Sequence, residues 1–244
     1  MELLKPLLQS AKNLLFLDLE GTQYTHEIIA IGAVLVSCDE KYVPYGEVKT
    51  FKRYCLTNSS IGSVIRTMTG IDEKFLKQNG ISYRQALVEL NDFLSTSTRS
   101  LKILVYGNND AKMVKTSYKV LENPLPFETN FTNFLINNIV DIEKVLNFFL
   151  RGKRSDMLSL VHLRQLLELP SNGKAHDPLN DAKDLYDIYK AFVSDKERMK
   201  RTYRSLLKNA DLVPSPIVSI IYDLLNGKSV TPEDLERCLD NYFA

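Results

Sequence analysis

The chain has 244 residues, of which 44% are hydrophobic, and its 31 basic side chains nearly balance its 30 acidic ones. This size allows one sizeable core, or a core with a small appendage. The even balance excludes an overall polycation, so any binding of nucleic acid must come from local patches. The three cysteines have no Cys-x-x-Cys spacing, which excludes a disulfide framework or a zinc knuckle and favours a reducing, cytoplasmic location.

No segment is typical of a secretion signal or of a membrane span. Lys5 and Lys12 interrupt the apolar N-terminal stretch, and no small-residue cleavage site follows it. No apolar run is long enough to cross a bilayer. We therefore expect no membrane partner.

The first part of the chain is typical of three strands. The run LLFLDL (14–19) is apolar, EIIAIGAVLVS (27–37) is rich in Ile and Val, and EVKTFKRYCLT (47–57) alternates apolar with polar residues. The connections between these runs are short, which predicts an antiparallel meander.

The middle of the chain alternates helical and strand patterns. Ser82 and Gln85 form a capping-box pattern, and Pro178 stands where the first turn of a helix tolerates proline. Strands are predicted at 101–106 and 137–142, and helices at 70–80, at 82–94, from Asp110 onward, at 157–169 and at 178–193. This order predicts an α/β domain with a mixed sheet.

The composition changes after about residue 195. The segment 195–208 is basic and helical in pattern, and two short helices are expected at 216–227 and 231–243, the second capped by Thr231. We therefore predict one domain over residues 1–194 and a helical C-terminal extension over residues 195–244.

Asp18 and Glu20 form the first candidate site. Side chains alternate along a strand, so these two carboxylates crowd one face of the first predicted strand. Two close carboxylates need a shared proton or a cation, and Mg²⁺ is a hard ion that prefers carboxylate oxygens. The alternative is a strand that ends in a solvated acidic turn.

Two further segments carry acids in suggestive places. Asp110 follows the strand 101–106 at its carboxyl end, where α/β sheets place their sites, although an Asp at a helix start is often only an N-cap. In GKAHDPLNDAKDL, His176 lies in a loop and Asp181 in the first helical turn, and both side chains can project toward one spot. The alternative is an ordinary loop-to-helix turn capped by Asp177.

Taken together, these motifs resemble those of the DEDDh (DnaQ-like) family of 3′-to-5′ exonucleases over roughly residues 11–192. The D-x-E-x-T motif is met by Asp18, Glu20 and Thr22, and the second motif by Asp110 in YGNND. His176 and Asp181 supply the third, H-x₄-D. The resemblance implies an RNase H-like α/β fold, in which a mixed sheet with an antiparallel meander and then parallel strands is flanked by helices.

The resemblance also implies a chemistry. The expected reaction is metal-dependent hydrolysis of phosphodiester bonds at the 3′ end of single-stranded DNA or RNA, with release of nucleoside monophosphates. Two divalent ions, Mg²⁺ or Mn²⁺, would be held by four acids, with His176 as the general base. The expected metal ligands are Asp18, Glu20, Asp110 and Asp181.

Substrate contacts are expected from the backbone at Gly21 and Thr22, although Gly21 replaces a bulkier residue of the family. Two basic stripes can follow a phosphate backbone, or they are solvated helix faces. Their members are Lys112, Lys115 and Lys119, and then Lys200, Arg201, Arg204 and Lys208.

Two alternatives to an exonuclease remain open. One is a catalytically silent nucleic-acid-binding module of the same fold, although the presence of all five motif residues argues against it. The other is a protein-interaction module in which the helices of 195–244 bind a protein partner. The sequence does not separate DNA from RNA as the substrate.

Overall fold

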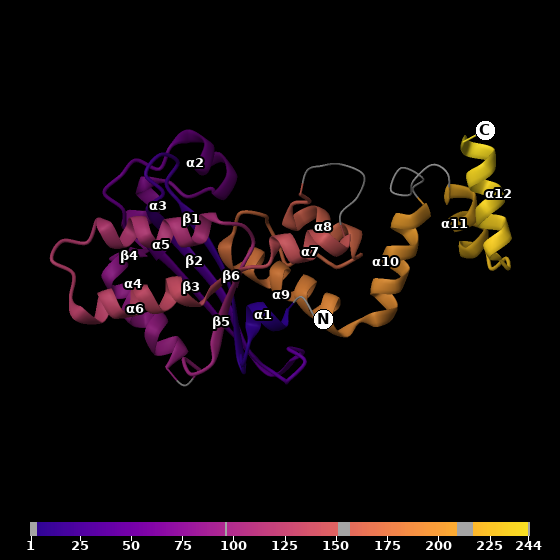
Figure 1. Ribbon diagram of the computed structural model, residues 1–244. Coiled ribbons are helices and arrows are strands. Elements are labelled where there is room, and N and C mark those ends of the chain that lie inside the picture. The colour runs from indigo at the N-terminus through magenta and orange to yellow at the C-terminus, as the bar shows by residue number, and fades with distance from the viewer. Residues whose placement is uncertain (1–3, 96, 151–156, 209–216, 244) are drawn as a thin grey trace.

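The structure is a computed structural model that describes residues 4–95, 97–150, 157–208 and 217–243. At its centre is a six-stranded sheet of order β4-β3-β2-β1-β5-β6 (Figure 1). The strands are β1 Asn13–Gly21, β2 Ile28–Cys38, β3 Pro44–Cys55, β4 Gly80–Ile81, β5 Leu101–Val105 and β6 Ile139–Asp141. β1, β2 and β3 form an antiparallel meander, and β5 and β6 continue the sheet in parallel with β1. The predicted mixed α/β sheet is confirmed.

The alternation of β1 divides the core into two layers. Leu14 and Phe16 belong to a cluster with α9, whereas Leu15 and Leu17 pack on the opposite side of the sheet. The first layer contains α1 Lys5–Leu8, α7 Glu143–Leu150, α8 Leu160–Leu166 and α9 Pro178–Ser194. The second contains α4 Tyr83–Leu94, α5 Asn109–Lys119 and α6 Pro126–Asn138.

Helix α9 is held on the sheet by aromatic packing. The fully buried ring of Phe16 lies 5.4 Å from that of Tyr186 and 5.2 Å from that of Tyr189, measured between centroids. Burial of one such side chain stabilises the fold by about 2–3 kcal/mol. Because α9 packs on β1 and β2, it covers the face that carries Asp18 and Glu20.

Two short helices, α2 Ser63–Thr69 and α3 Glu73–Asn79, lie beside the carboxyl end of β1. They pack on a small apolar cluster that includes Ile29, Ile61 and Leu76. This cluster supports the connection that leaves β1.

The C-terminal part of the chain is helical, as predicted. It contains α10 Lys196–Lys208, α11 Val218–Leu225 and α12 Pro232–Phe243, which lie to one side of the sheet domain (Figure 1). Thr231 caps α12 as expected, since Asp234 N donates to Thr231 Oγ1 at 3.4 Å and Thr231 N donates to Asp234 Oδ2 at 3.0 Å. Among the described residues, no helix is both long and apolar enough to cross a membrane.

Some predicted elements differ in detail. The helix expected over 157–169 is shorter, because the Ser159 hydroxyl caps α8 and Leu158 N donates to Asn147 Oδ1 at 2.6 Å instead of entering the helix. The capping box at α4 is only half formed. Ser82 Oγ accepts from Gln85 N at 3.1 Å, but the Gln85 amide turns to Glu89.

Candidate active site

Asp18 and Glu20 lie on the face of β1 that α9 covers. The strand continues to Gly21, two residues beyond the predicted run, so neither acid is the last residue of the strand. Pairing with β5, however, stops at Phe16, so both acids lie beyond the parallel neighbour. Opposite them on β2 stand Gly32 and Ala30, so no large side chain of β2 lies beside the two acids.

Gly32 allows α9 to begin directly over this part of the sheet. A Cβ atom at Gly32 would lie only 2.0 Å from the carbonyl carbon of Pro178. No larger residue fits without displacing the start of α9, and Gly32 pairs with Asp18. The sequence analysis missed this role, although a glycine inside a strand rich in Val and Ile is the signal of a close backbone approach.

The loop before α9 brings His176 and Asp181 to the β1 carboxylates. His176 N donates to Asp181 Oδ2 at 2.8 Å, and Asp177 caps the helix by accepting from the next N–H groups, as the capping alternative predicted. The imidazole Nδ1 lies 3.9 Å from Glu20 Oε1. Glu20, His176 and Asp181 each offer a ligand atom within 4.8 Å of the other two.

Asp110 reaches the same stretch of β1 from the opposite layer. It is the second residue of α5, one position after the observed helix start, and it is not the N-cap, which is Asn108. Because β5 no longer pairs with β1 at Leu19, the Leu19 N–H is available and donates to Asp110 Oδ1 at 3.0 Å. The alternative that Asp110 is only the N-cap of a helix is therefore wrong.

Burial and mutual repulsion favour the protonated forms of these acids. Burial, reinforced by Asp181 and Asp110, raises the pKa of Glu20 to about 8. Burial also raises the pKa of Asp110 to about 7, and burial together with the charges of Asp110 and Glu20 raises the pKa of Asp18 well above its ordinary value. Burial raises the pKa of Asp181 as well, although the hydrogen bond that Asp181 accepts from His176 N acts to lower it.

The carboxylate oxygens of this site are ligands that suit hard divalent cations. Within the described part of the chain, no N–H or O–H group donates to the carboxylates of Asp18 and Glu20. The cation beside the site, Lys52 on β3, is paired with Asp177 Oδ2. The carboxylates therefore lack a counter-charge of their own, and Mg²⁺ or Mn²⁺ coordinated by oxygens would supply it.

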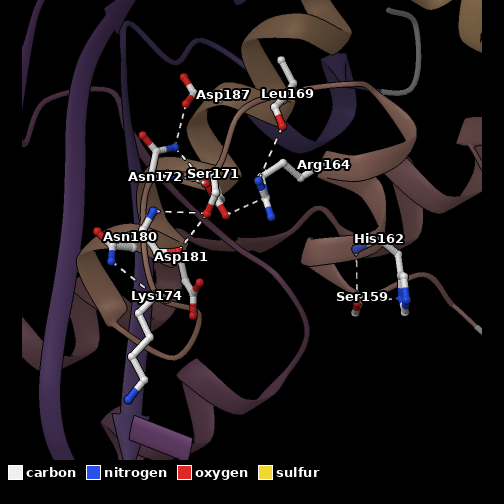
Figure 2. Close-up of polar contacts among 12 residues, drawn as sticks. Ser159, His162, Arg164, Leu169, Ser171, Asn172, Lys174, Asn180, Asp181 and Asp187 are labelled. Carbon is white, nitrogen blue, oxygen red and sulfur yellow. Dashed lines mark hydrogen bonds and ion pairs between the residues drawn. The ribbon is translucent and has the colours of Figure 1, made fainter. Parts of the chain in front are cut away.

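A polar network holds the loop that precedes His176 (Figure 2). Asn172 donates from its backbone N–H and from Nδ2 to Asp184 Oδ1, at 3.1 and 2.8 Å, and from Nδ2 to Asp187 Oδ2 at 2.8 Å. Arg164 of α8 pairs with the second oxygen of Asp184 at 3.1 Å. Asn180 Nδ2 also donates to the carbonyl of Lys174 at 3.2 Å. Our sequence analysis did not find this network, because its members carry no motif of their own.

The turn after β1 is closed by its own polar groups. Thr22 Oγ1 accepts from Glu27 N at 3.0 Å and shares a hydrogen bond with Thr25 Oγ1 at 2.7 Å. The Glu27 carboxylate accepts from Thr57 and Ser59 in a neighbouring loop. The Thr22 hydroxyl therefore fixes the turn. Gly21 lies against Met113 of α5, whose Sδ would be 3.0 Å from a Cβ at that position.

A family model described as "Exonuclease" matches residues 15–189. The chain belongs to this exonuclease family. Its fold is shared by the nuclease domain of 3′hExo, a DEDDh family member solved with bound rAMP, and the assignment to the DEDDh exonucleases is confirmed. That match has 20% identity and a TM-score of 0.59, and it covers 77% of this chain and 94% of the other. The predicted RNase H-like fold is thereby confirmed.

Two longer proteins share the fold. The full-length 3′-exonuclease matches with 20% identity and a TM-score of 0.58 over 77% of this chain, which spans only 62% of that protein. Exonuclease I of E. coli, solved with a dT13 oligonucleotide, matches with 18% identity and a TM-score of 0.53 over 82% of this chain and 45% of its own. No curated protein sequence matches the chain. The family to which the chain belongs is one of exonucleases, which are hydrolases of the nuclease class, and DEDDh-type exonucleases use divalent metal ions.

Proposed function

We propose that this chain is a metal-dependent 3′-to-5′ exonuclease that hydrolyses single-stranded DNA or RNA from a free 3′ end and releases nucleoside monophosphates. The observation that carries the proposal is the convergence of Glu20, His176 and Asp181 within 4.8 Å, in an exonuclease-family chain. Asp18 lies on β1 between Leu17 and Leu19, and Asp110 of α5 accepts a hydrogen bond from Leu19 N of the same strand. The bound rAMP and dT13 of the solved neighbours are consistent with such substrates.

The acids would hold two divalent ions, Mg²⁺ or Mn²⁺. Asp18, Glu20 and Asp181 would hold one ion, and Asp110, together with Asp18, would hold the other. When bound, such ions neutralise charge on the phosphate and lower the pKa of the attacking water. The chain contributes a rigid strand for Asp18 and Glu20 and two helix starts for Asp110 and Asp181.

His176 is proposed to accept the proton of the attacking water. Its side chain is 45% exposed, so the proton can pass on to solvent, and it lies on the Glu20 side of the site. The loop that carries it is held by α8 and α9, which keeps the imidazole near the reacting atoms. The backbone at Gly21 and Thr22 is proposed to contact the terminal nucleotide.

The test is a degradation panel with matched single-stranded and duplex DNA and RNA. A strand labelled at its 5′ end should give a descending ladder in Mg²⁺ or Mn²⁺, and a 3′-blocked strand should resist. Asp18→Ala should fold and be inactive. Cleavage of a closed circular strand, or full activity in excess EDTA, would refute the proposal. Binding without cleavage would favour the silent module.

The domain division is also a proposal. We propose that residues 1–194 form the exonuclease domain and that residues 195–244 are an extension available to a protein partner. The family match, which ends at residue 189, supports this division. A cytoplasmic location stays a prediction from cysteine usage.

A further inference from the structure

Helix α10 concentrates positive charge in an otherwise nearly neutral chain. Its thirteen residues, KERMKRTYRSLLK, contain six basic side chains and one acidic side chain. At 3.6 residues per turn, five of the six lie within roughly 140° of one another around the helix. These five are exposed, and they are Lys196, Lys200, Arg201, Arg204 and Lys208. The opposite side of the helix buries Thr202 and Leu206.

The cationic face is held in a fixed orientation. Arg198, the sixth basic residue, donates to Asp195 Oδ2 at 2.9 Å and to the carbonyl oxygens of Leu167 and Glu168 at the end of α8. Met199 packs against the core cluster that contains α9. Figure 1 shows α10 following α9 and running along the side of the sheet domain. These contacts of Arg198 and Met199 therefore set the orientation of the face that carries the five exposed cations.

The face has little counter-charge of its own. Within the described part of the chain, its one ion pair joins Lys200 to Glu197 at 2.8 Å, and both side chains are largely exposed. Such a surface pair is screened by water and salt and is readily exchanged for another anion. An extended polyanion would satisfy the remaining cations.

An exposed aromatic ring borders this cationic face. Tyr203 is 51% exposed, and at 3.6 residues per turn it lies at the edge of the face, next to Lys196 around the helix. No ring contact involves it among the described residues. Cations that follow a phosphate backbone, together with an exposed ring that stacks on bases, are the two components of surfaces that bind single strands.

We propose that the cationic face of α10 binds the phosphate backbone of the substrate strand several nucleotides upstream of its 3′ end. This inference rests on the proposed function, because it assumes that the 3′ end enters the site at the start of α9. The seventeen residues of α9 span about 25 Å, and α10 begins at its other end. A strand of two or three nucleotides therefore cannot occupy both places.

The test compares long and short strands. The variant Lys200→Gln/Arg204→Gln removes two cations, and Lys41→Gln/Lys49→Gln removes two exposed lysines from the β2–β3 hairpin as a matched control. Binding of a fluorescent 20-nucleotide strand, as DNA and as RNA, is measured in EDTA at several salt concentrations. Cleavage of 3- and 20-nucleotide strands is measured in Mn²⁺.

Each phosphate contact to a single strand changes the slope of log affinity against log salt by about 0.7, which is worth about 5-fold at 0.1 M salt. The double variant should therefore bind the 20-nucleotide strand roughly 20-fold more weakly, with a slope smaller by about 1.4. Its cleavage of the 3-nucleotide strand should equal that of the parent chain. The control variant should match the parent in all three measurements.

Unchanged affinity and slope in the double variant would overturn the inference and make α10 a solvated face. A change in the sedimentation of the double variant without a change in nucleic-acid binding would also overturn it, because α10 would then be a contact between two copies of the chain. If the 20-nucleotide strand binds through α10 but neither strand is cleaved, the proposed function fails, and of this inference only the binding of nucleic acid by α10 is kept. If both strands are cleaved equally by the variant and the parent, only this inference fails.

Discussion

His176 is the residue at which a structural and a catalytic role separate most clearly. As general base, it should contribute about 10²–10⁴-fold to the rate. His176→Ala should lower single-turnover cleavage by that factor at saturating Mn²⁺, while substrate and metal binding persist, because the imidazole is not a proposed ligand. His162→Ala is the matched control, since His162 lies on α8 and its ring bonds Ser159 at 2.9 Å.

A structural role for His176 would give a different result. Its backbone has a φ of 61°, in the left-handed region, so the residue also shapes the turn. If it did only that, His176→Ala would lower the melting temperature while the rate per folded molecule stayed near that of the parent. That outcome would remove the general base from the proposal.

Single residues were predicted well where a local rule applied. Asp18 and Glu20 share a face because strand side chains alternate, and the cap at Asp177 follows from its place before Pro178. Gly32 was not predicted, because its role depends on Pro178, which is distant in sequence. Such close approaches between layers are set by packing and leave little trace in a local pattern.

At the scale of elements, the loop before α9 is the part of the site that depends most on distant contacts. Asn172→Ala removes the Nδ2 bonds to Asp184 and Asp187 while leaving the proposed metal ligands intact. Since a displacement of about 1 Å can cost 10²-fold in rate, we expect kcat to fall by about 10- to 100-fold, with a smaller change in KM. Steady-state kinetics on a short strand measures both.

Asn79→Ala controls for the loss of an Asn side chain elsewhere. Asn79 ends α3, and among the described residues its side-chain amide donates a hydrogen bond only to the carbonyl of Phe75, at 2.9 Å. This variant should leave kcat unchanged. If Asn172→Ala also kept the parent kcat, the network would stabilise the fold without positioning His176.

The elements themselves were predictable where their patterns were strong. The predicted bounds of β1 and β2 agree with the observed ones within a residue or two, because apolar runs of this kind are compatible with few structures other than a buried strand. Helices α6 and α7 were not predicted. In α6, Asn and Thr are frequent and have low helix propensity. A buried Glu128 paired with Arg84 at 3.0 Å and a row of Phe rings stabilise this helix through tertiary contacts.

At the scale of the whole molecule, opposite charges are kept apart. The formal net charge of +1 hides an acidic site at one end of α9 and a cationic helix at the other. A polyanionic strand would be repelled by the metal-free site and attracted by α10. The composition predicted neither feature, because it averages over both.

This arrangement makes the stability of the metal-free protein depend on pH in an unusual direction. Burial and neighbouring acids raise the pKa of Glu20 to about 8 and that of Asp110 to about 7, whereas unfolded carboxyl groups titrate near pH ~4. Between about pH 5 and 8 the folded state therefore binds more protons than the unfolded state. The free energy of unfolding must fall as pH rises through this window.

We therefore expect the melting temperature in EDTA to fall between pH 5.5 and 8, and added Mn²⁺ to raise it more at pH 8 than at pH 5.5, by about 5 °C or more. The reason is that protons and metal ions compete for the same carboxylates. Glu20→Gln should flatten the pH dependence in EDTA, whereas Glu47→Gln, an exposed acid on β3, should not. Thermal melts of the three proteins at each pH decide the matter. A metal-free melting temperature that rose toward pH 8, or an equal effect of Mn²⁺ at both pH values, would show that the acids are neutralised in another way.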